Sequence, residues 1–320
     1  MAAQNKDNEE VLDLTNSHLP NLDNVTLAPT LQVLDLTANR LNSIDPRILA
    51  LTGLVSINFR QNLLTDVSAW SGAACCSTMQ DCEFRDNQLK ELPDLSKFSA
   101  LTRLEFSYNE IKSIESLASL HAPGLQELYV AANKVPAIRG VSQLTALTTL
   151  ELGSNRVRAI EGLDSLTGLR ELWLGRNRIA RIENLAPLTS LRRLSVQSNR
   201  LESMAGVEVC GALEELYLSH NGITALEGLE ALTRLKILDV SSNRITRVQG
   251  LGALTQLEDL WLNDNAIPAL DAALEEGLRP VAATLTTLYL ENNPAAKEAG
   301  YKARMLALLP KLQQLDSDDV

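Results

Sequence analysis

Apolar residues recur along most of the chain in two alternating rhythms. In segments such as ELWL (171–174), two leucines alternate with Glu171 and Trp173, which is typical of a β-strand with one buried face. In segments such as IENLAPLTSL (182–191), apolar residues fall on every third position, which suits a 3₁₀ turn better than an α-helix. We therefore predict coils that each consist of a short strand, a turn at an asparagine and a tight return.

The two rhythms together form the pattern LxxLxLxxNxIxxI, which resembles the leucine-rich repeat. From Asn133 to Asn265 every step between asparagines is 22 residues. A degenerate first copy places Ser17 at the asparagine position, so we predict thirteen strand units. The asparagine amides can satisfy backbone groups where the chain turns between coils, so we interpret them as a structural ladder. They are Asn39, Asn62, Asn87, Asn109, Asn133, Asn155, Asn177, Asn199, Asn221, Asn243, Asn265 and Asn293.

This pattern predicts an α/β fold, namely a leucine-rich repeat solenoid. We expect a curved parallel sheet on its concave face, short 3₁₀ turns on its convex face and a helical cap at the C-terminus. The predicted organisation is a disordered acidic tail over residues 1–9, repeats over 10–293 and the cap over 294–320.

Two steps of the repeat are longer than the rest. Asn62 and Asn87 are 25 residues apart, and Asn265 and Asn293 are 28 residues apart. Loop bulges or a longer return turn would absorb both insertions, and the second is long enough to hold a helical turn.

The residue four positions before each asparagine lies between the two leucines and points to the opposite face of the strand. This column holds five of the eight Trp and Tyr residues of the chain, and most of its other members are acidic. Because a solenoid of this type leaves its concave face bare, we expect binding there. In order, the column reads Asp13, Asp35, Asn58, Glu83, Glu105, Tyr129, Glu151, Trp173, Ser195, Tyr217, Asp239, Trp261 and Tyr289.

A second regularity lies within this column, because Tyr129, Trp173, Tyr217 and Trp261 are 44 residues apart, one in every second coil. With about 4.8 Å between strands they would span roughly 30 Å, which suits a protein partner better than a small ligand. The alternative is that these aromatic residues pack against neighbours on the same face for stability. An acid stands two residues upstream of each of them: Glu127, Glu171, Glu215 and Asp259.

The composition narrows the class of partner. A formal net charge of −11 argues against nucleic acid and anionic membranes and favours a basic protein surface. No stretch of about 18 apolar residues occurs, so we expect a soluble intracellular protein.

The residues that could carry chemistry are scattered. His18, His121 and His220 fall in separate coils and belong to no hydrolase motif, so we predict that the protein is not an enzyme and has no cofactor. The four cysteines lack the spacing of a zinc site and are expected to be reduced, with Cys82 and Cys210 buried at leucine positions and the other two partly exposed.

Particular coils of the chain are similar to those of a known family. The segments LRRLSVQSNRL, LEELYLSHNGI and LEDLWLNDN, with the NP…Y…LP…LD cap, resemble the family of regulatory subunit 7 of type 1 protein phosphatase over residues 10–318. This resemblance implies a non-catalytic subunit of nucleus and cytoplasm that holds the phosphatase catalytic subunit on its concave face, in maturation or storage, alongside a second inhibitory subunit. It implies contacts at Glu105, Tyr129, Glu151, Trp173, Asp239, Asp259, Trp261 and Tyr289, and the 44-residue alternation adds Tyr217.

Two of these positions depart from the family pattern, because Glu105 and Tyr129 stand where aspartate and phenylalanine are expected. We expect the protein to be monomeric on its own. A different function remains open, that of a structural or cytoskeletal adaptor that uses the same repeat to bind another basic protein.

Overall fold

The structure, a computed structural model, describes residues 10–320, so the tail predicted over residues 1–9 lies outside the described residues. The chain divides into two compact units, residues 1–156 and 157–320. Each unit is built from the predicted coils and is described by itself.

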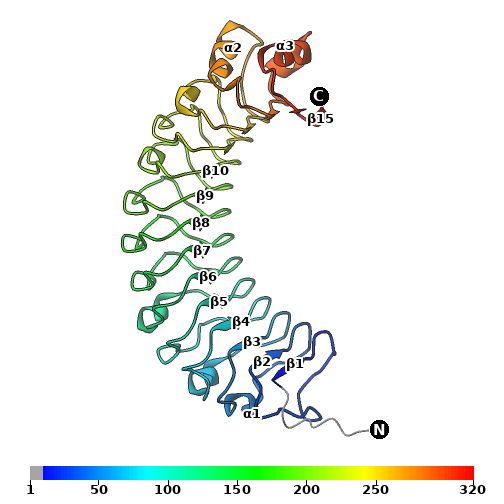
Figure 1. The fold of residues 1–320 in the computed structure, drawn as a ribbon, viewed down its shortest axis with the longest axis vertical. Helices are drawn as coiled ribbons and strands as arrows, with labels where there is room; N and C mark the ends of the chain where they lie inside the picture. Colours follow the sequence, from blue (N-terminus) through cyan, green and yellow to red (C-terminus); the bar gives the residue numbers. More distant parts are fainter. Residues whose placement is uncertain (1–9) are drawn as a thin grey trace. The chain divides into compact units, whose positions relative to one another are not determined.

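The strands of the first unit are three residues long, run parallel and follow one another in chain order (Figure 1). Equivalent repeat positions face each other, so that Leu104 pairs with Leu128 and Glu105 with Tyr129. This register stacks each inward leucine on that of the next coil. The strands are β1 (Val11–Asp13), β2 (Val33–Asp35), β3 (Ser56–Asn58), β4 (Asp81–Glu83), β5 (Arg103–Glu105), β6 (Glu127–Tyr129) and β7 (Thr149–Glu151).

The second unit continues the same pattern, with Trp173 opposite Ser195 and Trp261 opposite Tyr289. Its last two strands are shorter, and the final one pairs antiparallel with its neighbour. In both units the third residue of each long strand is the predicted column residue. The strands are β8 (Glu171–Trp173), β9 (Arg193–Ser195), β10 (Glu215–Tyr217), β11 (Ile237–Asp239), β12 (Asp259–Trp261), β13 (Thr287–Tyr289), β14 (Gln314–Leu315) and β15 (Asp318–Asp319).

Short helical turns close many coils on the side away from the strands (Figure 1). The predicted 3₁₀ turns are present, and a genuine α-helix fills the longer second step, where the Asp271 side chain accepts a hydrogen bond from the Leu274 N–H (3.0 Å). The 3₁₀ turns are η2 (Ser68–Gly72), η3 (Glu115–Ser119), η4 (Val207–Val209), η5 (Leu251–Ala253), η6 (Arg279–Val281) and η7 (Ala295–Lys297). The α-helices are α1 (Pro46–Leu49), α2 (Ala272–Leu278) and α3 (Tyr301–Leu308), the helix expected near the C-terminus.

The ladder asparagines join successive coils through buried hydrogen bonds. Asn133 is 8% exposed, and its Oδ1 accepts the N–H of Ile111 at 2.9 Å. Its Nδ2 donates to the carbonyl of Phe106 at 2.9 Å and to that of Val130 at 3.2 Å. One side chain therefore satisfies backbone groups of two coils, as the sequence predicts.

The first longer step is filled by an aromatic cluster. Trp70, on η2, is fully buried, with its ring 6.4 Å from Phe59, 6.1 Å from Phe84 and 5.9 Å from Phe98. The three extra residues of this coil thus bring a large side chain into the interior rather than forming a loose bulge.

The cysteines are reduced, and three of the four are buried. Cys82 and Cys210 take leucine positions in the core, as predicted. The expected partial exposure holds for Cys76 but is wrong for Cys75, which is fully buried inside the irregular coil. Burial raises the pKa of the Cys75 thiol to about 11, which keeps it protonated and unreactive.

Candidate functional site

Each long strand has a face opposite its core residues, which carries the column residues and which we call the open face. In the first unit this face is organised around one guanidinium group. Arg103, on β5, lies 3.1 Å from Asp81 and 3.2 Å from Glu83. It also lies 3.6 Å from Glu105 and from Glu127. The acids of this face are therefore partly neutralised and fixed in position by a residue from the same sheet.

Burial changes the acidity of two carboxyls on this face. Glu105 is only 3% exposed, and this burial raises its pKa although its Oε1 accepts the Ser107 N–H at 2.6 Å. Burial likewise raises the pKa of Glu151, an effect that the charge of Arg85 partly offsets. Both carboxylates would gain from a cation placed on this face by a partner.

Tyr129 is held by neighbours on both sides. Its hydroxyl donates to the Glu127 carboxylate at 3.1 Å, and the Arg103 guanidinium lies 5.3 Å from the ring centroid. Burial and the charge of Glu127 raise the pKa of the Tyr129 hydroxyl to about 12, so it remains a donor at neutral pH.

In the second unit two aromatic rings of the column bridge the strand between them. Trp173 on β8 and Tyr217 on β10 stack with centroids 6.2 Å apart and planes 25° apart. Between them, on β9, stands Ser195, which is 2% exposed. Because the intervening residue is small, the rings of alternate strands meet above it. The sequence left open the alternative that these aromatic residues pack against neighbours on the same face, and such packing is present. Both rings remain half-buried rather than fully covered.

The acids upstream of these aromatic residues form a ladder with the arginine between them. Arg193, on β9, contacts Glu171 at 2.7 Å and Glu215 at 2.9 Å. The other oxygen of each acid accepts from the aromatic residue of its own strand, Trp173 Nε1 at 3.3 Å and Tyr217 OH at 2.9 Å. Acid and aromatic residue therefore act as one hydrogen-bonded pair.

The fourth pair differs from the other three. Asp259 is one methylene shorter than the glutamates at the equivalent positions, and it makes no hydrogen bond to Trp261. The indole Nε1 of Trp261 is buried without a hydrogen-bond partner in residues 10–320. The ring instead meets Tyr289 edge to face, with centroids 5.7 Å apart and planes at 74°.

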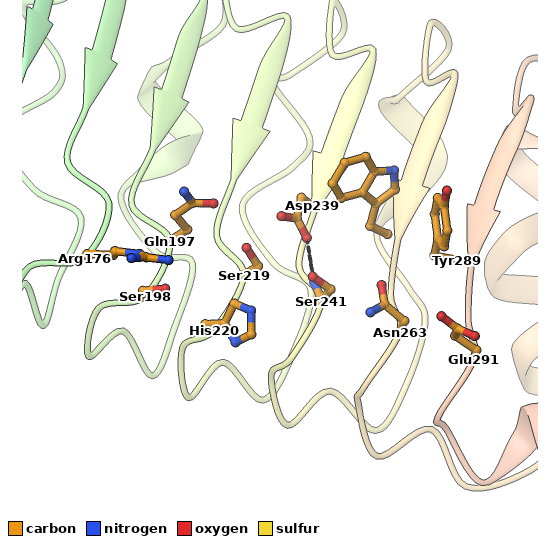
Figure 2. Close-up of a pocket in the computed structure, with 11 residues that line it drawn as sticks. Arg176, Gln197, Ser198, Ser219, His220, Asp239, Ser241, Asn263, Tyr289 and Glu291 are labelled. Atoms are coloured by element: carbon orange, nitrogen blue, oxygen red, sulfur yellow. Dashed lines mark hydrogen bonds between the residues drawn. The ribbon is translucent and has the colours of Figure 1, made fainter. Parts of the chain in front are cut away.

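An open pocket of about 520 Å³ lies beside this last aromatic pair (Figure 2). Asp239 is 4% exposed at its wall, and its Oδ1 accepts both the N–H (3.0 Å) and the hydroxyl (2.6 Å) of Ser241. Tyr289 is fixed through its hydroxyl, which accepts from Gln314 Nε2 at 2.6 Å. The residues that line the pocket are Arg176, Gln197, Ser198, Ser219, His220, Asp239, Ser241, Trp261, Asn263, Tyr289 and Glu291.

The structure places every candidate partner-binding residue on the open face of its own unit. Three of them lie in the first unit: Glu105, Tyr129 and Glu151. Six lie in the second: Trp173, Tyr217, Asp239, Asp259, Trp261 and Tyr289. The roles of Arg103 and Arg193 were not predicted from the sequence, although the alternation of acid and arginine at register-paired positions indicates them. The loop residues of the pocket, such as His220 and Glu291, were not predicted either, because no feature of the repeat distinguishes them.

Residues 10–320 contain neither a cluster of metal ligands nor a membrane-spanning helix. No group of His, Cys, Asp or Glu side chains there is placed to hold a metal ion. No helix there is long and apolar enough to cross a membrane.

Comparison with known sequences identifies the repeat as a leucine-rich repeat. A family model described as leucine rich repeats in two copies matches residues 212–251 and 233–272. Among curated proteins, the Arabidopsis thaliana protein phosphatase 1 regulatory inhibitor subunit PPP1R7 homolog is 48% identical over 140 residues. That match covers 43% of this chain and 42% of the relative, so the chain spans less than half of the relative's length.

Solved structures support the fold alone. An internalin, inlF of Listeria monocytogenes, superposes with a TM-score of 0.84 at 24% identity, covering 97% of this chain and 87% of that one. The functional domain of InlJ from the same organism gives a TM-score of 0.72 at 21% identity, covering 95% and 66%. These likenesses confirm the predicted solenoid of parallel strands.

Proposed function

We propose a function from the premise that this chain is a leucine-rich-repeat protein related, over 140 residues, to regulatory subunit 7 of type 1 protein phosphatase. On that premise the protein is a non-catalytic regulatory subunit that binds the catalytic subunit of a type 1 serine/threonine phosphatase. The observation that carries the proposal is the 48% identity to a protein named as such a subunit.

The open faces support the proposal through their chemistry. Half-buried Trp and Tyr rings stand among carboxylates, and Trp, Tyr and desolvated charged groups are the residues that dominate protein interfaces. The raised pKa values of Glu105 and Glu151 mean that each carboxylate is stabilised when a partner brings a cation close. A basic surface on the phosphatase is therefore the complementary partner.

The resemblance extends the proposal to the protein's setting. We place the subunit in nucleus and cytoplasm, monomeric on its own, where it holds the phosphatase during maturation or storage. A second inhibitory subunit joins on the phosphatase, and the relative's description as a regulatory inhibitor supports a lowered activity of the bound enzyme.

The test removes two aromatic residues of the second unit. Trp173→Ala with Trp261→Ala should weaken binding of the purified phosphatase catalytic subunit by about a thousandfold, since interface hot spots contribute roughly 2 kcal/mol or more each and two are removed. Binding would be measured by isothermal titration calorimetry. Addition of the wild-type protein should also lower phosphatase turnover of a phosphopeptide.

A matched control separates loss of contact from loss of fold. Tyr108→Ala with Leu63→Ala removes two apolar side chains that are 51% and 45% exposed and lie outside the column. This variant should bind normally, and both variants should keep the circular dichroism of the wild type. Full binding by a folded Trp variant would refute the proposed contact. Recovery of a filament or motor subunit instead of the phosphatase, by mass spectrometry of proteins purified from lysate, would favour the adaptor function.

A further inference from the structure

The residue that follows each ladder asparagine forms a second column along the edge of the sheet. We call this column the rim; in the second unit, between Asn177 and Asn265, it consists of Arg178, Arg200, Gly222, Arg244 and Ala266. Each rim residue is docked on the preceding coil by its backbone, as the N–H of Arg200 is to Ile179 O (2.8 Å) and that of Arg244 to Ile223 O (2.8 Å). Rim side chains of successive coils are therefore neighbours.

The first unit shows how far these side chains reach. Lys134 and Glu110 hold equivalent rim positions in adjacent coils, and their charged groups meet at 2.9 Å. In the second unit the corresponding neighbours are Arg178 and Arg200, which carry the same charge. Neither of them makes an ion pair or a side-chain hydrogen bond with any residue that the structure describes.

More arginines stand on the same turn as Arg178. Arg176 and Arg181 are exposed on either side of it, and both are likewise without an ion pair within residues 10–320. Figure 2 shows Arg176 at the end of the pocket, beside Gln197 and Ser198. Ion pairs are also lacking at other arginines of the described chain, such as Arg234 and Arg247, so this group is distinguished by the number of arginines that it brings together.

Three arginines on one turn and a fourth at the rim of the next coil are a dense group of positive charge for an acidic chain. The net charge is −11, so acids outnumber bases and could have paired with the rim as Glu110 pairs with Lys134. Adjacent like charges do not stabilise a fold, and the backbone contacts of the rim need no arginine side chain. Arginine is, however, the side chain best suited to bind carboxylates in a two-pronged geometry.

We propose that the rim of the second unit, centred on Arg178 and Arg200 with Arg176 and Arg181 beside them, binds an acidic segment of a partner polypeptide. Neighbouring coils are about 5 Å apart, and alternate side chains of an extended peptide are about 7 Å apart, so two or three Asp or Glu residues would reach the four guanidinium groups. A long nucleic acid would also meet the acids of the open face, which repel it. This surface is distinct from the column of the proposed function and takes a partner of the opposite charge.

The test uses a fluorescein-labelled peptide of ten glutamates as the probe and the whole protein as the receptor. Fluorescence anisotropy should show binding at low salt that weakens as salt rises, because exposed ion pairs are screened. Arg178→Glu with Arg200→Glu should raise the dissociation constant at least fivefold. Calorimetric binding of the phosphatase catalytic subunit by this variant should be unchanged, which separates the rim from the proposed function.

A control variant carries the same change in charge elsewhere on the surface. Arg234→Glu with Lys311→Glu alters two exposed residues outside the rim. It should bind the peptide within twofold of the wild type. Absence of wild-type binding to the peptide would overturn the proposal, as would equal losses in both variants or tighter binding of a ten-nucleotide oligothymidine than of the peptide.

Discussion

Replacing one ladder asparagine tests what holds the coils together. Asn133→Ala removes an amide that joins two adjacent coils of the first unit while leaving their leucines in place. Val130 O keeps a second donor, the Nδ2 of Asn155 at 2.8 Å. Phe106 O likewise keeps the Nδ2 of Asn109 at 3.0 Å. The N–H of Ile111 has no other acceptor in the described chain and is left buried and unpaired.

The loss of stability follows from the difference between the two carbonyls, which each keep a donor, and the Ile111 N–H, which loses its acceptor. A buried donor left without an acceptor costs about 1–3 kcal/mol, and each lost hydrogen bond whose carbonyl remains satisfied costs about 0.5–1.5 kcal/mol. One orphaned N–H and two such losses sum to about 2–6 kcal/mol. We therefore expect Asn133→Ala to lower the free energy of unfolding by about 3 kcal/mol.

Urea unfolding followed by far-ultraviolet circular dichroism measures this change. With a slope of about 3 kcal/mol per molar urea, the midpoint should fall by about 1 M. Hydrogen–deuterium exchange should also show faster exchange in the peptide that contains Ile111, since its amide loses its acceptor.

The control is an asparagine with no role in the ladder. Asn42 is exposed, and its side chain contacts only the Ser43 hydroxyl at 3.3 Å, so Asn42→Ala should change stability by less than about 0.5 kcal/mol. If Asn133→Ala cost no more than Asn42→Ala, the ladder would not be the device that joins the coils, and leucine packing alone would have to account for the fold.

Three further substitutions test the open faces. Asp259→Glu should stabilise the second unit by about 1 kcal/mol, because the longer carboxylate can accept from the unpaired Nε1 of Trp261. Glu171→Asp should destabilise it by a similar amount. Thermal unfolding measures both changes, and a shift of either variant in the opposite direction would contradict this reasoning. Glu151→Gln should raise the melting temperature at pH 7. Burial raises the folded pKa of Glu151 above its ordinary 4.5, so its contribution to stability is complete below pH 4.5 and is lost as the pH rises through the folded value. The difference in stability between wild type and variant should therefore grow from pH 4.5 to pH 7, and a flat difference would contradict this reasoning.

The repeat made most of the fold predictable. Leucine spacing and the asparagines located every long strand, because each coil must bury the same positions against its neighbours. Irregular coils were less predictable, since their extra residues obey no repeat. The burial of Cys75 depends on how Trp70 fills the interior, which the spacing of the chain does not encode.

The candidate surface was predictable in position but not in its internal bonding. Alternation of strand faces placed Trp173 and Tyr217 on the open side, yet it could not reveal that their rings stack over Ser195. That contact depends on side-chain size at three positions in three coils. The unpaired Nε1 of Trp261 likewise follows from a single methylene absent at Asp259, a difference that a pattern of acids and aromatics does not register.

The stacking of Trp173 on Tyr217 above a small residue has a consequence for how such a chain can be lengthened or shortened. One coil is enough to continue the leucine core, but the stack over β9 needs two: an acid-plus-aromatic strand and a spacer strand, which here carries Arg193 and Ser195. Removal of a single 22-residue coil would preserve the core and place two aromatic strands side by side, with Glu171 and Glu215 in direct apposition and no Arg193 between them. Variants that lengthen or shorten the chain at β8–β10 and keep this surface should therefore differ by multiples of 44 residues.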